Sequence, residues 1–92
     1  MQVDASGGNM VQNMPTVASA PNGQITVAMC VQDAGESNTV TVQPASGSGD
    51  KFIYRGQFGL PSIALSRVGE SRNFRPLTIP SGANAGNYWL VT

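Results

Sequence analysis

The stretch ITVAMCV at residues 25–31 carries the clearest structural signal in the sequence. Its Ile, Val and Met residues alternate with smaller or more polar ones, which is the period of two expected of a half-buried β-strand. The stretch TVTVQ at residues 39–43 repeats this alternation, and Pro44 ends it. Because turn-forming residues 33–38 connect them, the two strands are predicted to be antiparallel neighbours.

Further short alternating or aromatic segments follow, separated by turns that contain Gly or Pro. They lie at residues 51–55, 62–67, 74–79 and 88–92. In the third of them we expect Leu77 and Ile79 to point inward, and Pro76 to restrict the strand to an edge or a bulge. We expect Trp89 to be the main packing residue. The sequence therefore predicts an all-β fold, a small antiparallel sandwich or barrel of about six short strands.

Residues 1–23 lack this alternation and are rich in Gly, Pro, Ser, Asn and Gln. They predict an extended N-terminal arm, whereas residues 24–92 form the β domain. The arm has too many apolar residues for a fully solvated linker, so we expect it to lie in a groove of its own domain or of another subunit; a disordered terminus is the alternative. The candidate partner-binding residues of the arm are Val3, Met10, Val11 and Met14.

The charged residues are few and unevenly distributed. They make up 11% of the 92 residues, and the formal net charge is zero, which argues against binding a nucleic-acid backbone. All charged residues up to position 50 are acids, whereas positions 51–92 hold all five bases and a single acid, Glu70. This asymmetry predicts either complementarity within one domain or docking between neighbouring copies.

The residue types needed for most catalytic chemistry are missing from the sequence. Without histidine, neither a Ser-His-Asp nor a Cys-His nucleophile can be built, and the lone Cys30 cannot form a zinc site or an internal disulfide. Asp33, Glu36 and Asp50 lack the acidic spacing of a calcium loop and are better explained as solvated turn residues. We therefore expect no enzymatic activity, no catalytic residues, no cofactor and no metal.

Arg67, Arg72 and Arg75 surround Phe74 in a pattern that also occurs on base-stacking surfaces. In a domain of zero net charge we expect such arginines to pair with carboxylates, and we expect no nucleic-acid partner. The three arginines and Tyr88 remain candidates for contact with a protein partner. No apolar run approaches the roughly 18 residues of a membrane span, so no membrane partner is expected.

Three segments, taken in order, carry a resemblance to a known group of proteins. They are VTVQPASG at 40–47, ALSRVGES at 64–71 and NYWLV at 87–91. The order resembles tailed-bacteriophage surface proteins, in which a strand ending in Pro-Ala-Ser-Gly-Asp, a Leu-x-x-x-Gly-Glu-Ser turn and a closing Asn-Trp-x-Val strand build small trimeric β modules. The resemblance covers residues 40–92 and implies a virion component, made in the host cytoplasm.

The resemblance leaves a capsid protein and a tail protein as alternatives. Because the chain starts at Met1, ends on a strand and has no shaft repeats, we expect it to be complete in itself, which favours a capsid decoration (cement) protein. Such a protein is expected to be a homotrimer on the capsid surface that binds the major capsid protein, with the arm crossing a capsomer boundary. The alternatives are a tail-fibre or baseplate adaptor, or a receptor-binding module, and a regulatory module unrelated to virions.

Overall fold

The computed structural model describes residues 2–5, 7–19, 25–30, 38–67 and 69–92. These residues form nine strands and one short 3-10 helix, η1 (Val17–Ser19), and none of them is in an α-helix. The strands are β1 (Gln2–Asp4), β2 (Met10–Asn13), β3 (Ile25–Cys30), β4 (Val40–Gln43), β5 (Lys51–Tyr54), β6 (Gln57–Leu60), β7 (Ile63–Leu65), β8 (Ser71–Ile79) and β9 (Gly86–Val91). The predicted all-β class is confirmed, with more strands than the expected six.

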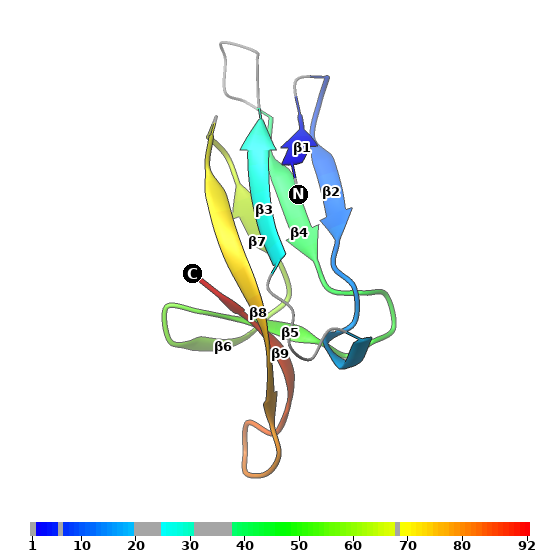
Figure 1. The fold of residues 1–92 in the computed structure, drawn as a ribbon, viewed down its shortest axis with the longest axis vertical. Coiled ribbons are helices and arrows are strands. Elements are labelled where there is room, and N and C mark those ends of the chain that lie inside the picture. Colours follow the sequence, from blue (N-terminus) through cyan, green and yellow to red (C-terminus); the bar gives the residue numbers. More distant parts are fainter. Residues whose placement is uncertain (1, 6, 20–24, 31–37, 68) are drawn as a thin grey trace.

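The strands form two sheets in an elongated molecule. One sheet has the order β1-β3-β8-β9-β5-β6 and the other the order β2-β4-β7, and the principal extents are 46 × 23 × 22 Å. Figure 1 shows the β8–β9 hairpin projecting at one end of the long axis, with β5 and β6 crossing that axis. The larger sheet therefore supplies both one wall of the core and the projecting end.

The predicted pairing of the first two strands is wrong. β3 pairs with β1 and β8, whereas β4 pairs with β2 and β7 in the other sheet. Three pairings, β1 with β3, β2 with β4 and β5 with β9, are parallel, so the sheets are mixed and not purely antiparallel. Alternation specifies which side of a strand is buried but not which strand lies beside it, and this explains the error.

The N-terminal segment lies on its own chain. β1 runs parallel to β3, and β2 runs parallel to β4. The β2 pairing is extended at both ends, because Met10 N donates to Thr39 O at 2.9 Å and Met14 N donates to Gln43 O at 2.8 Å. The described part of the segment thus pairs with strands of its own chain. In its described part, the N-terminal segment forms one strand of each sheet.

The core lies between the two sheets and is centred on large aromatic side chains. Trp89, Phe52 and Phe74 are fully buried, and the rings of the two phenylalanines meet edge to face at 5.7 Å. The expected central role of Trp89 is confirmed. The other buried residues of this cluster are Val3, Ala5, Met14, Val17, Val27, Val40, Val42, Ile63, Leu65 and Val91.

The direction of the side chains on β8 follows from Phe74. Because Phe74 points into the core, alternation turns Leu77 outward, and its side chain is 38% exposed. The prediction that Leu77 points inward is therefore wrong. Pro76 lies beyond the part of β8 that pairs with β3, where the only neighbour among the described strands is β9. The predicted edge position of Pro76 is confirmed for these residues.

A tight hairpin joins β5 to β6, a strand that the sequence analysis did not predict. Tyr54 pairs with Gln57 across a two-residue turn in which Arg55 has a φ of 53° and Gly56 a φ of 79°. Two positive φ angles are typical of the type I′ turn, whose twist matches that of the adjoining strands. The pairing register shifts along β6, where Gly59 also has a positive φ of 76°, as in a β-bulge.

Candidate functional site

Two of the four candidate residues of the N-terminal segment are unavailable to a partner. Val3 and Met14 are buried in the core of their own chain, which corrects the prediction that they bind another protein. Met10 and Val11 remain exposed, and Val11 has 56% of its surface accessible. Both lie on β2, at the edge of the three-stranded sheet as far as the described residues show. The candidate residues of this segment that remain accessible therefore both lie on β2.

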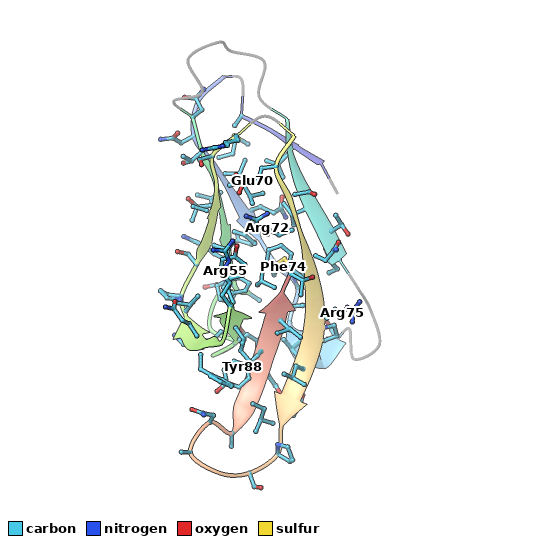
Figure 2. The ribbon with its side chains drawn as sticks, turned by 90° about the vertical axis from the view of Figure 1, so that its left-hand side faces the viewer. Arg55, Glu70, Arg72, Phe74, Arg75 and Tyr88 are labelled. Carbon is cyan, nitrogen blue, oxygen red and sulfur yellow. The ribbon has the colours of Figure 1, made fainter. Side chains whose placement is uncertain are left out.

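The three candidate arginines do not form a common surface. Arg67 is exposed in the turn before β8, and Arg75 points away from the core side of β8. Arg72 points to the same side as the buried Phe74 (Figure 2), where its Nη2 atom contacts Glu70 Oε2 at 3.0 Å. Since Phe74 is buried and the arginines diverge, the structure does not build the base-stacking arrangement considered from the sequence.

Tyr88 lies beneath a residue that the sequence analysis did not select. Only 8% of Tyr88 is exposed; its hydroxyl donates to Asn84 O at 2.7 Å, and its ring meets that of Phe58 edge to face at 5.8 Å. Phe58 itself is 47% exposed, and the outward-pointing Leu77 pairs with Tyr88 across the β8–β9 ladder. We call Phe58, Leu77 and Tyr88 the aromatic patch. The Arg-Gly dipeptide before Phe58 is the sequence signal for the hairpin that presents it.

The described side chains leave the exposed charge predominantly positive. Asp50 is buried and accepts a hydrogen bond from Val17 N at 2.9 Å. Glu70 accepts hydrogen bonds from Ser66 N at 2.7 Å and Arg67 N at 3.2 Å as well as from Arg72. Both carboxylates therefore bind groups of their own chain. The exposed cations of the described residues are Lys51, Arg55, Arg67 and Arg75. These four cations are the described side chains that can meet an acidic group of a partner.

A pocket opens where β5, β8 and β9 meet. Its volume is about 480 Å³, and it is lined by Tyr54, Arg55, Arg72, Leu90, Val91 and Thr92. The guanidinium carbons of Arg55 and Arg72 lie 5.2 and 5.7 Å from the centre of the Tyr54 ring. We call this the arginine pocket. Its combination of two guanidinium groups with apolar walls suits a ligand that has an anionic group beside an apolar one.

Arg55 occupies a backbone conformation that its own side-chain contacts do not explain. It is the only non-glycine residue with positive φ among those described, and this conformation costs a residue with a Cβ roughly 1–2 kcal/mol. An exposed cation–π contact, such as that of Arg55 with Tyr54, contributes about 0.5–1 kcal/mol. The contact does not offset the cost, so glycine or asparagine is the more favourable residue for the turn itself.

The described residues contain no group of three or more His, Cys, Asp or Glu side chains that could hold a metal ion. Of the acids considered for calcium, Asp33 and Glu36 lie outside the described residues, and Asp50 binds the backbone of η1. Among the same residues, no helix has the length and apolar character needed to cross a membrane. The candidate sites in the described structure are therefore the edge of β2, the aromatic patch and the arginine pocket.

Comparison of the chain with family models, with curated proteins and with solved structures finds no match. The functional argument therefore rests on the residues and on their arrangement.

Proposed function

We propose that this chain is a non-enzymatic structural protein that binds the outer head surface of a tailed bacteriophage as a capsid decoration protein. The observation that carries the proposal is the aromatic patch, because Phe58 leaves nearly half of its surface exposed while its ring rests on Tyr88. Large aromatic residues that are supported from below and exposed above are typical anchors of protein interfaces. The resemblance of residues 40–92 to phage surface modules supports a virion component, and the sedimentation experiment described below distinguishes the head from the tail.

The chemistry around the patch specifies the partner surface. Lys51 pairs in register with Tyr88 and is exposed beside it. Asp50 and Glu70 are both engaged within the chain. The matching surface on the major capsid protein therefore has an apolar centre for Phe58 and acidic residues around it.

The edge of β2 supplies the contact between copies in the proposed trimer. This strand has one neighbour, β4, among the described strands, and its sequence MVQN contains no charge. An uncharged edge strand with free backbone groups is a ready site for pairing with another chain. A trimer places three aromatic patches on one assembly, so modest individual contacts combine into firm attachment.

The proposal is tested by sedimenting the purified protein with undecorated phage heads. The wild-type chain is expected to pellet with heads, whereas Phe58→Ser is expected to remain in the supernatant. Ala64→Ser, an exposed change on the other sheet, serves as the control and is expected to behave as wild type. If the wild-type protein ignores heads but pellets with isolated tails, the proposal fails in favour of a tail-fibre or baseplate adaptor.

The role of β2 is tested separately by light scattering. The wild-type protein is expected to have the mass of a trimer, and Val11→Lys to have that of a monomer, because a charge on the edge strand blocks further pairing. Val11 is largely exposed, so the substitution leaves the fold intact, which far-ultraviolet circular dichroism verifies. A wild-type monomer, or a Val11→Lys trimer, contradicts the proposed contact.

A further inference from the structure

We infer that the arginine pocket binds a carboxylate side chain of an acidic peptide segment, with Arg55 as the residue that captures it. The pocket lies at the meeting point of β5, β8 and β9 and does not share a residue with the aromatic patch. The inference therefore goes beyond the proposed attachment to a phage head and does not depend on it.

The two guanidinium groups of the pocket have different partners. Arg72 contacts Glu70 Oε2 at 3.0 Å, and its Nη1 atom also donates to Ser71 O at 2.9 Å. Glu70 is in turn held by the backbone of the turn before β8. Arg55 is exposed, and its interaction in the described structure is the contact with the Tyr54 ring. Of the two guanidinium groups that line the pocket, that of Arg72 is therefore paired with a carboxylate side chain, and that of Arg55 contacts an aromatic ring.

The walls of the arginine pocket combine cationic, aromatic and apolar residues. Both guanidinium groups lie close to the Tyr54 ring, and both line the same pocket. The lining also includes the apolar residues Leu90 and Val91, of which Val91 belongs to the core. A guanidinium group matches the two oxygens of a carboxylate with two parallel hydrogen bonds, and a neighbouring aliphatic group of the ligand fits the apolar wall. A glutamate or aspartate flanked by apolar residues has this combination.

The backbone conformation of Arg55 is unusual for a residue with a Cβ atom. Its φ of 53° is favourable for glycine or asparagine and unfavourable for arginine. A residue held in such a conformation without compensating contacts inside the chain is a marker of function. The Arg55 guanidinium group lies over the Tyr54 ring, and Figure 2 shows Arg55 and Arg72 on the same side of β8 as Phe74.

The probe is a short capped peptide in which one glutamate is flanked by two leucines, with the glutamine version as its counterpart. Each is titrated into the full-length protein while the Arg55 and Arg72 side-chain Nε–H signals and the Thr92 amide signal are followed by NMR. The glutamate peptide is expected to shift all three signals and to bind more weakly as salt is added, and the glutamine peptide to leave them unchanged. Equal binding of the two peptides overturns the inference.

The decisive variant is Arg55→Asn, because asparagine accepts the turn conformation and removes only the guanidinium group. It is expected to weaken binding of the glutamate peptide about tenfold, as the loss of one charge-assisted contact predicts. Arg67→Asn makes the same change of charge in an exposed turn outside the pocket and is expected to bind within about a factor of two of wild type.

Two outcomes identify another role for Arg55. If Arg55→Asn unfolds more easily than wild type, Arg55 stabilises the hairpin and the inference is overturned. If glucuronate binds in preference to the glutamate peptide, the ligand is an acidic sugar and the peptide assignment is overturned. Because these titrations use the isolated protein, they can fail while attachment to phage heads succeeds, and the reverse also holds.

Discussion

The two faces of strand β9 carry similar residues in different surroundings. Trp89 and Val91 point inward to Phe52 and Phe74, and they belong to the core. The outward-pointing Tyr88 meets the ring of the exposed Phe58 edge to face, and the next outward residue, Leu90, is half-buried. The inner face is thus completed by the second sheet, whereas the outer face is covered only in part by its own chain. The difference shows that burial of a residue does not by itself assign it to the core, because Tyr88 is buried and still forms part of a surface.

Two substitutions at adjacent positions of β9 give the sharpest test of this difference. Trp89→Ala is expected to lower the free energy of unfolding by about 3–5 kcal/mol, because it empties the centre of the core. Leu90→Ala, on the other face, is expected to cost only about 1 kcal/mol, because its side chain is half-buried. Urea denaturation measures both values, and equal losses contradict the division into two faces.

A matched variant separates the volume of Trp89 from its polar group. The buried Nε1–H group of Trp89 has no hydrogen-bond acceptor among the described residues. Trp89→Phe keeps most of the ring and removes this unpaired donor, so it is expected to cost clearly less than Trp89→Ala.

Asp50 is the one carboxylate that is buried among the described residues. Asp50→Ala removes the acceptor of the Val17 N–H group and is expected to cost about 1–3 kcal/mol, because the buried donor loses its partner. Asp50→Asn keeps an oxygen at this place and is expected to retain most of the stability. Denaturation at constant pH compares the two variants; if asparagine is as harmful as alanine, the hydrogen bond is not the cause.

Removing the Tyr88 hydroxyl group is expected to have a smaller effect on the free energy of unfolding. Tyr88→Phe removes the hydrogen bond to Asn84 O and leaves the ring under Phe58, so it is expected to cost about 1 kcal/mol. Thermal unfolding measures the loss. The amide exchange of residues 82–86 is expected to become faster at the same time, since Tyr88 ties this turn to the strand. Unchanged exchange indicates that other contacts hold the turn.

The smallest predicted change has the opposite sign. Arg55→Asn is expected to raise the free energy of unfolding by up to about 1 kcal/mol, because asparagine adopts positive φ at lower cost. Gly56→Ala, which places a Cβ at a φ of 79° in the same turn, is expected to lower it by about 1 kcal/mol. Thermal unfolding of the two variants tests whether strain in this turn is confined to Arg55. A loss of stability in both indicates that the Arg55 side chain stabilises the hairpin.

Residue patterns predicted which side chains of a strand are buried better than they predicted which strands pair with each other. The alternation of Val40 and Val42 and the burial of Trp89 were predictable, because one buried face leaves a period of two in the sequence. The parallel pairing of β5 with β9 left no such trace, since contacts between distant segments are not encoded in local periodicity. The inward direction predicted for Leu77 failed because Phe74, three residues earlier, decides the phase of β8.

The candidate sites were less predictable than the fold. The exposure of Met10 and Val11 agrees with the residues selected from the sequence, whereas the burial of Val3 and Met14 depends on where β1 and β2 pair. Phe58 was missed because β6 contains Gly59 and a shift in register, which obscure its alternation. The arginine pocket joins residues from three strands, and only the folded chain brings them together.

The central position of β9 has a consequence for the order in which the protein folds. Its neighbours in the sheet are β8 and β5, yet its residues come after those of every other described strand. The parallel ladder that joins Lys51 to Tyr88 closes a long loop, and such distant pairing slows folding. During synthesis the inner face of the larger sheet stays incomplete until residues 86–91 have left the ribosome. The nascent chain therefore gains its cooperative stability only after residues 86–91 have emerged.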